Sequence, residues 1–164
     1  MRGFDTAQSP ATALNPDTAP CEVLVEFEYS LSSEIAMVSP FVDRLMRSIS
    51  SFGVTDDFEV DVEVALREAI LNAVIHGNRQ DPHKHVYVTI VCGADGEVAM
   101  TIRDEGAGFD SSSVPDPTAP EHRMSTHGRG IYLMRALMDE VSFEESGTVV
   151  YMRKSPSSPL HRPQ

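Results

Sequence analysis

The sequence has little positive charge, and this shortage excludes whole classes of partner. Its 13 Lys and Arg residues stand against 25 Asp and Glu residues, which gives a formal net charge of −12 at pH 7. A protein this acidic is not expected to bind the phosphate backbone of nucleic acid or an anionic membrane surface. An acidic surface does suit a basic protein partner.

Long apolar runs and cysteines are also scarce. No run is long enough to span a bilayer, and residues 1–20 lack the apolar segment of a secretory signal. The two cysteines, Cys21 and Cys92, form no C-x-x-C pair and no metal-binding cluster, so we interpret both as small core residues in a reducing compartment. We therefore predict a cytoplasmic protein with no membrane attachment.

The residues that are present suit one folded domain. The chain has 164 residues, of which 41% are hydrophobic, and it shows no internal repeat. Pro, Ser, Thr and Ala dominate residues 1–20, and Pro and Ser dominate residues 155–164. Both ends are therefore expected to be disordered tails. The folded domain is expected over residues 21–154.

Hydrophobic periodicity predicts five strands and three helices. Two strand pairs are joined by turn sequences, GADG and Ser146-Gly147, and so predict hairpins. The second helix has Asp56 or Asp57 as a candidate N-cap and Gly77 at its C-terminal end. In chain order we expect a strand at 21–29, helices at 33–50 and 57–76, strands at 85–92 and 97–103, a helix at 129–140, and strands at 141–145 and 148–154.

These elements predict an α+β fold. Strands that arrive as hairpins form a mostly antiparallel sheet, and three helices are enough to cover one face of it, which gives a two-layer α/β sandwich. The first strand alternates cleanly and could lie at an edge. The predicted core face of this strand comprises Val23, Val25, Phe27 and Tyr29. The predicted core face of the first helix comprises Ile35, Val38, Val42, Leu45, Met46 and Ile49.

The second helix carries a polar column inside an apolar sequence. In EAILNAVIHGN, residues 68–78, the residues Glu68, Asn72 and His76 are spaced so that a helix stacks them on one face. On this helix alone two interpretations stay open: the polar groups are satisfied by neighbouring backbone, or they line a cleft. The opposite, core-facing positions are Leu66, Ile70 and Val74.

A long aperiodic segment separates two glycine pairs. Residues 109–127 contain three prolines and many small polar residues, which suits either a lid or a mobile insertion. DEGAGF precedes this segment and HGRG follows it. The first pair, Gly106 and Gly108, lacks the third glycine of a dinucleotide fingerprint, and no G-K-[ST] exists for a P-loop. The second pair, Gly128 and Gly130, opens a helix whose free N–H groups suit a phosphate.

Taken together, these residues resemble a known family. The ordered set resembles the ATP-binding domain shared by gyrase, the heat-shock chaperone, histidine kinases and the mismatch-repair ATPase, which has a Bergerat-type fold. More narrowly, REAILNAVIHGN, IRDEGAGFD and GRGIYLMRALMDEV are similar to the bacterial anti-sigma-factor serine kinases. The resemblance covers about residues 21–153. The residues that carry it are Glu68-x-x-x-Asn72, Asp104-x-Gly106-x-Gly108 and Gly128-x-Gly130.

The resemblance implies a role for each side chain in binding ATP and Mg²⁺. Asn72 would offer its side-chain oxygen to Mg²⁺, and Glu68 would orient or deprotonate the attacking hydroxyl. Asp104 would accept a hydrogen bond from the adenine amino group, which predicts ATP over GTP. The alternative interpretation is that Asp104 is an ordinary turn residue with no role in binding. Thr148 would help to fix the adenine through water.

The resemblance also implies roles for the glycines and for arginine. Gly106 and Gly108 would let the backbone approach the nucleotide, while Gly128, Arg129 and Gly130 would wrap its phosphates. Arg129 could in addition neutralise charge on the transferring phosphoryl group. His76 is assigned no role.

The resemblance implies a partner-switching regulator. Its relatives bind a sigma factor, phosphorylate a serine of an anti-anti-sigma antagonist, and pair as homodimers near the first strand. Two other functions remain open: an ATP-gated binding protein without phosphotransfer, and the catalytic piece of a histidine kinase. Glu68 favours the kinase, and the lack of a preceding helical hairpin with a phosphoacceptor His disfavours the histidine kinase.

Overall fold

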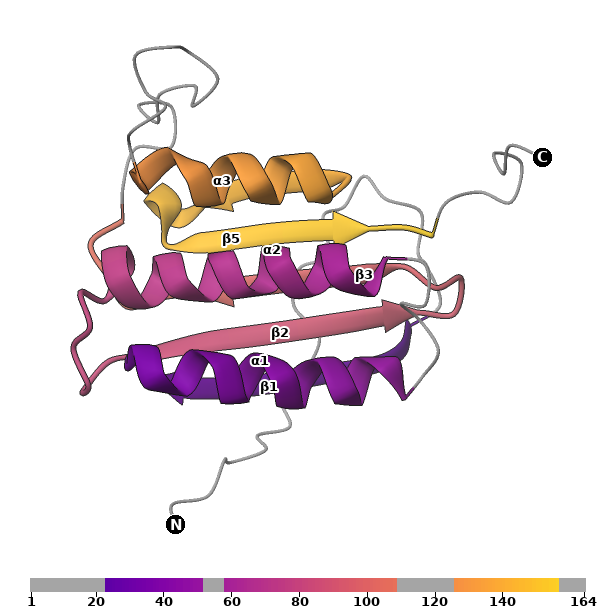
Figure 1. The fold of residues 1–164 in the computed structure, drawn as a ribbon, viewed down its shortest axis with the longest axis horizontal. Coiled ribbons are helices and arrows are strands. Elements are labelled where there is room, and N and C mark those ends of the chain that lie inside the picture. Colours follow the sequence, from indigo (N-terminus) through magenta and orange to yellow (C-terminus); the bar gives the residue numbers. More distant parts are fainter. Residues whose placement is uncertain (1–22, 52–57, 109–125, 157–164) are drawn as a thin grey trace.

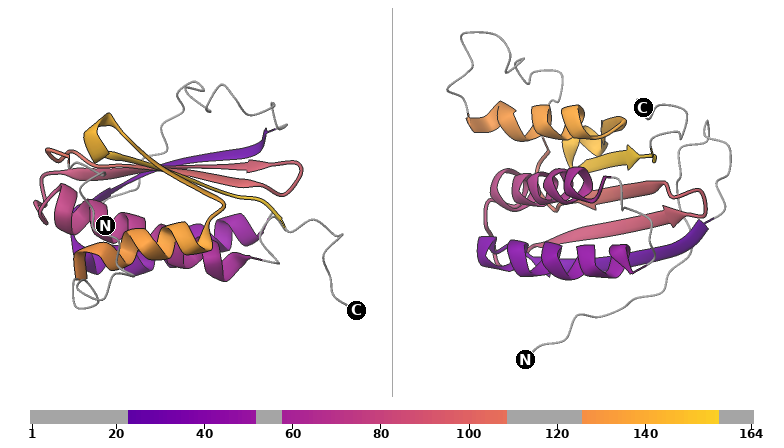
Figure 2. Two further views of the ribbon diagram at one scale, coloured as in Figure 1. Left: turned by 90° about the horizontal axis from the view of Figure 1, so that it is seen from above. Right: turned by 45° about the vertical axis from the view of Figure 1, so that its right-hand side comes forward.

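Five strands form one antiparallel sheet, and three α-helices cover one of its faces (Figures 1 and 2). This computed structural model describes residues 23–51, 58–108 and 126–156. The predicted α+β sandwich is confirmed. The helices are α1 (Ile35–Ser50), α2 (Glu59–Asn72) and α3 (Thr126–Leu137), and the strands are β1 (Val23–Ser32), β2 (His85–Gly93), β3 (Val98–Arg103), β4 (Glu140–Glu144) and β5 (Val149–Lys154).

The sheet order is β1-β2-β3-β5-β4, so β1 is an edge strand as its sequence indicated. β1 pairs with β2 in a register that sets Phe27 opposite Ile90 and Tyr29 opposite Val88. Phe27 and Tyr29 pack on the core, whereas Val23, predicted on the same face, is 47% exposed at the start of the strand. The disagreement arises because Val23 lies at a register shift where the pairing begins.

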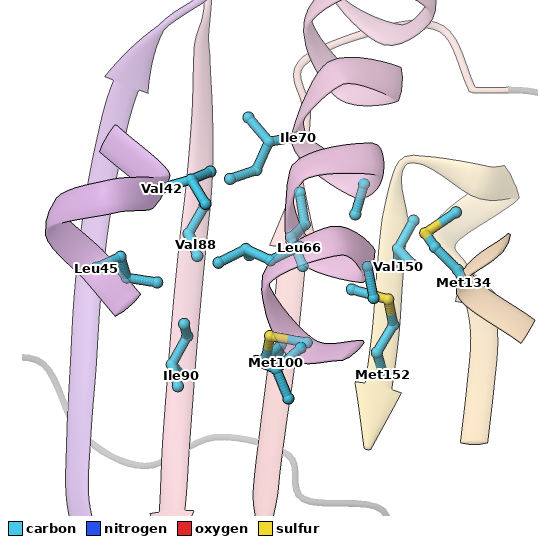
Figure 3. Close-up of a cluster of buried hydrophobic side chains, with 14 of the residues drawn as sticks. Val42, Leu45, Leu66, Ile70, Val88, Ile90, Met100, Met134, Val150 and Met152 are labelled. Atoms are coloured by element: carbon cyan, nitrogen blue, oxygen red, sulfur yellow. The ribbon is translucent and has the colours of Figure 1, made fainter. Parts of the chain in front are cut away.

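The core lies between the helices and the sheet, as Figure 3 shows. The predicted stripe of α1 is buried except for Ile35, which is 45% exposed because it is the first residue of the helix. Leu66, Ile70 and Val74 are fully buried, as predicted. Cys92 is fully buried in β2, and this burial raises the pKa of its thiol to about 11, in keeping with a small core residue.

Both hairpins form, and both turns contain residues with left-handed backbone. In the β2–β3 turn Gly96 has φ of 88° and donates its N–H to the Gly93 carbonyl. The β4–β5 turn is a 3-10 turn, η4 (Glu145–Gly147), in which all three residues have positive φ. Among the described residues, no helix combines the length and apolarity needed to cross a bilayer.

The helix predicted at 129–140 is shifted toward the N-terminus. It begins at Thr126 and ends at Leu137, because Met138 and Asp139 lead directly into β4. The Lys154 ammonium group donates a 2.6 Å hydrogen bond to the Leu137 carbonyl and so satisfies one of the last helical acceptors. The glycine pair predicted to open the helix therefore lies within its first turns.

Candidate functional site

The polar side of α2 lies against the beginning of α3. A Cβ atom on Gly130 would lie 2.8 Å from Oε2 of Glu68 and 3.1 Å from Nδ2 of Asn72. A Cβ contact shorter than 3.0 Å forces a shift, so the backbone of α3 approaches α2 as closely as glycine permits. Two parts of the predicted site, separated by about sixty residues of sequence, thus meet in space.

Glu68 and Asn72 are only partly buried, and neither side chain forms a hydrogen bond or ion pair within the described residues. The interpretation in which neighbouring backbone satisfies these two groups therefore finds no support in the part of the chain that the structure describes. Their oxygen atoms are available to a ligand on the side where Gly130 leaves room.

The helix changes type between Asn72 and Gly77, and this change lets both residues lie at the site. After Asn72 the helix continues as a π-helix, η1 (Ala73–Gly77), and the Asn78 N–H bonds the Ala73 carbonyl at 2.7 Å. In an α-helix a residue five positions further lies about 140° away around the axis. The wider π-turn brings positions five apart nearer to one face, so Asn72 and Gly77 can both serve the site.

Gly77 meets the loop that follows β3. A Cβ atom on Gly77 would lie 2.5 Å from Oδ2 of Asp104, and one on Gly106 would overlap the Gly77 carbonyl oxygen. The sequence indicated Gly77 only as a helix end, but its φ is not positive. Glycine is needed there because of the close approach to Asp104, a contact from a distant part of the sequence that leaves no local signal.

Asp104 is held in a defined orientation. Its backbone N–H bonds the Thr148 carbonyl at 3.0 Å, and its Oδ1 accepts the Gly106 N–H at 2.7 Å. Burial raises the pKa of the Asp104 carboxyl, while the Gly106 N–H and the Lys84 charge oppose the rise. Asp104 is therefore a turn residue, as one interpretation had it, and it is also a partly buried carboxylate beside Gly77 and Gly106.

Gly108 lies beside the β4–β5 turn. It has φ of 75°, and a Cβ atom there would overlap the Ser146 carbonyl oxygen and lie 3.3 Å from Cγ2 of Thr148. Thr148, expected at the start of the last strand, lies one residue before β5, because its hydroxyl and its N–H both bond the Glu145 carbonyl and hold it in the turn. The structure thus brings Gly108 and Thr148 together.

Comparison with known proteins identifies the family that has this arrangement. Residues 31–154 match the family described as histidine kinase-like ATPase domain. The chain belongs to the histidine kinase-like ATPase family. It is 36% identical over 132 residues to the anti-sigma F factor of Geobacillus thermodenitrificans (strain NG80-2), a match that covers 76% of this chain and 79% of that protein.

Further anti-sigma F factors give the same result. The protein of Geobacillus stearothermophilus is 37% identical over 108 residues, covering 62% of this chain and 72% of its own. That of Priestia megaterium is 33% identical over 113 residues, covering 65% and 76%. The resemblance to anti-sigma-factor proteins of this ATPase superfamily is therefore confirmed.

Several predicted features lie outside the described residues. These include residues 109–125 of the expected lid, Cys21 and most of both expected tails. The prediction that Asp56 or Asp57 caps the second helix is wrong, because α2 begins at Glu59 and its N-cap residue is Phe58. Gly128 is in the first turn of α3, and Arg129 beside it is exposed. Within the described residues, Arg129 forms no hydrogen bond or ion pair with the other site residues.

A hollow of about 360 Å³ lies elsewhere on the sheet. β1, β2 and β3 line it, with Glu28, Tyr87, Thr101 and Arg103 among its residues. It includes none of the residues predicted for nucleotide binding. The candidate ATPase site lies instead around α2, because the residues predicted for nucleotide binding come together there.

Proposed function

We propose that this protein is an anti-sigma factor and an ATP-dependent serine kinase whose substrate is an anti-anti-sigma antagonist. The observation that supports it best is the meeting of Gly130 with Glu68 and Asn72. It puts a helix N-terminus suited to phosphates against the carboxylate and amide suited to phosphoryl transfer. The relatives named anti-sigma F factor support the regulatory part.

At the base end, Asp104 would select adenine. Its Oδ1 is used by the Gly106 N–H, which leaves Oδ2 to accept the exocyclic amino group of adenine. Guanine offers an oxygen at that position, so a carboxylate would repel it. Gly77 and Gly106 would keep side chains out of the space beside the base, and Thr148 would approach it through water.

At the phosphate end, the free backbone N–H groups in the first turn of α3, at and before Gly128, would bind the phosphate oxygens, with Arg129 beside them. Gly130 would leave room for the phosphates beside Glu68 and Asn72. Asn72 would hold Mg²⁺ through Oδ1, and this fits because that amide has no other partner within the described residues. Bound Mg²⁺ would offset the negative charge of the phosphates.

Glu68 would act on the substrate serine. Its carboxylate would accept the hydroxyl proton while the serine oxygen attacks the γ-phosphorus, and the bond from that phosphorus to the β–γ bridging oxygen would break. The products would be a phosphoserine and ADP. Glu68 suits this task because its oxygen faces Gly130, beside the place where the γ-phosphate would lie.

The partners follow from the same proposal. An acidic protein with a net charge of −12 would suit a basic sigma factor, and we propose no binding to nucleic acid or to a membrane. A homodimer would use the edge strand β1, where Val23 and Leu24 are exposed. We also propose a cytoplasmic location, a domain over residues 21–154, and a lid over residues 109–127.

The deciding experiment is phosphoryl transfer from γ-labelled ATP with Mg²⁺ to candidate antagonist proteins. Wild type is compared with Glu68→Ala, Asn72→Ala and the distant surface control Arg47→Ala. Label on an antagonist serine that only the first two variants abolish would support the kinase. ATP binding without transfer in any pairing would favour an ATP-gated binding protein, and absence of ATP binding would refute the nucleotide site itself.

A further inference from the structure

Asn78, which directly follows the π-helix η1, is buried to 1% exposure and uses its whole side-chain amide. Its Nδ2 donates to the Ser33 hydroxyl at 2.7 Å and to the His85 carbonyl at 2.8 Å. Its Oδ1 accepts the backbone N–H of Glu105 at 2.8 Å. Both N–H groups and the carbonyl oxygen therefore have partners, so the amide is held in one orientation.

The three partners come from three separate segments. Ser33 joins β1 to α1, His85 is the first residue of β2, and Glu105 lies in the loop after β3. Glu105 closes a ring, because its carboxylate accepts the His85 backbone N–H at 2.6 Å while its own N–H goes to Asn78. The ring ties the loop after β3 to both the end of α2 and the beginning of β2.

This ring lies one residue away from the candidate base site on each side. Gly77, next to Asn78, is in close approach to Asp104, and Asp104 is next to Glu105. Because Asp104 directly precedes Glu105, a hydrogen bond that holds the Glu105 backbone amide also holds the Asp104 carboxylate in place. We propose that Asn78 is a positioning residue that holds Asp104 in the orientation required for the adenine base. The identity of the base rests on the proposed function, whereas the hold on the loop does not.

The chemistry of the pocket requires an amide. An aspartate at position 78 could accept from Glu105 but would set a carboxylate oxygen against the His85 carbonyl oxygen. A serine or alanine would be too short to reach the Glu105 N–H. This position therefore requires a side chain that both donates and accepts hydrogen bonds, so a residue of similar volume alone would not replace Asn78.

The first test is residue-resolved amide hydrogen exchange on the full chain without nucleotide. In Asn78→Ala the Glu105 amide should exchange at least about tenfold faster, which corresponds to about 1.4 kcal/mol of lost protection. The matched control is Ser33→Ala, which removes one bond of Asn78 and leaves its bond to Glu105. The control should change Glu105 exchange by less than about twofold. If Asn78→Ala does not fold, Asn78→Ser replaces it.

The second test separates the base from the phosphates. Calorimetry gives the Kd of Mg-ATP and of Mg-triphosphate, which lacks the base, for the same proteins. Asn78→Ala should weaken ATP about tenfold and triphosphate less than about twofold, an asymmetry that a general loss of stability would not produce. Equal weakening of both ligands, or Glu105 exchange no faster than in Ser33→Ala, would overturn the proposal. If wild type binds no ATP, the proposed function fails while the exchange data still decide the role of Asn78.

Discussion

The two ends of the candidate site differ in what surrounds their glycines. At the base end, the space beside Gly106 is limited by the Gly77 carbonyl, and that beside Gly108 by the Ser146 carbonyl. At the phosphate end, Gly130 meets the tips of the Glu68 and Asn72 side chains. A carbonyl of the main chain cannot move without its segment, whereas a side-chain tip can rotate.

This difference has a consequence for function. The base end is fixed by the fold, through β3, the β4–β5 turn and the end of α2, so adenine would bind to a preformed surface. The phosphate end consists of side chains on α2 and the first turns of α3, which follow the expected lid in the chain. Adjustment during turnover is therefore expected at the reacting end.

The largest effect is expected from Gly106→Ala. Its new Cβ atom would overlap the Gly77 carbonyl, so the Asp104 loop must move. A displacement of about 1 Å at a reacting site can cost about a hundredfold in rate, and we expect at least that loss in phosphoryl transfer, with a lower melting temperature. Single-turnover transfer and thermal unfolding measure the two effects.

Gly96→Ala is the control for this change. Gly96 also lies in a turn, with φ of 88°, but at the other end of β3 from Asp104. Alanine at such a φ destabilises the fold by about 1 kcal/mol or more, so this variant should lose stability and keep its transfer rate. Wild-type transfer by Gly106→Ala would show that the base end is not rigid.

A smaller and different effect is expected from Gly130→Ala. The new methyl group would meet the ends of the Glu68 and Asn72 side chains, which can rotate away, and alanine favours a helix by up to about 1 kcal/mol. Stability should therefore stay constant or rise, while displacement of Glu68 lowers the transfer rate by about tenfold to a hundredfold.

A double-mutant cycle with Glu68→Gln tests that cause. If Gly130→Ala acts by moving Glu68, the two losses will not add, because the second change removes what the first displaces. Additive losses in the transfer rate would show instead that the alanine disturbs phosphate binding by another route.

The sequence predicts the layers of this protein better than it predicts its contacts. Alternation in β1 and the stripe of α1 are local patterns, so strand, helix and buried face follow from them. Gly77 and Asn78 could not be recognised in that way, because their importance comes from a carboxylate and an amide about 27 residues further along the chain. The π-turn at Ala73 likewise leaves no local signal that separates it from the preceding α-helix.

Asp104→Asn should affect binding and stability in opposite directions. Asn can keep the bond from Gly106, but its NH₂ group then faces the adenine amino group, so ATP affinity should fall about tenfold. Because burial raises the pKa of Asp104, the folded state holds the proton more tightly than the unfolded state. The ionised carboxylate therefore opposes folding at neutral pH, and removing it should raise the melting temperature.

The pH dependence of stability tests whether the Asp104 charge opposes folding. In wild type, the contribution of Asp104 to stability is favourable at low pH and is lost as the pH rises from about 3.9, the ordinary pKa of Asp, through the raised value. The asparagine variant should lack that decline in a series of melts without nucleotide. A variant that is less stable than wild type at pH 7 would contradict this assignment.

The smallest effect is expected from Arg67→Ala, one residue from Glu68. The guanidinium faces α1, where it donates to Ser39 at 2.8 Å and pairs with Asp43 at 3.3 Å, and it also pairs with Glu63 at 2.8 Å. These partners are largely exposed, so their loss should cost at most about 1 kcal/mol of unfolding free energy in chemical denaturation.

The Kd for ATP should change by less than about twofold in this variant, because Arg67 and Glu68 project from different sides of α2. A change of tenfold or more would mean that the contact between α1 and α2 sets the position of Glu68. The phosphate end would then depend on the fold as closely as the base end does, and the contrast between the two ends would no longer hold.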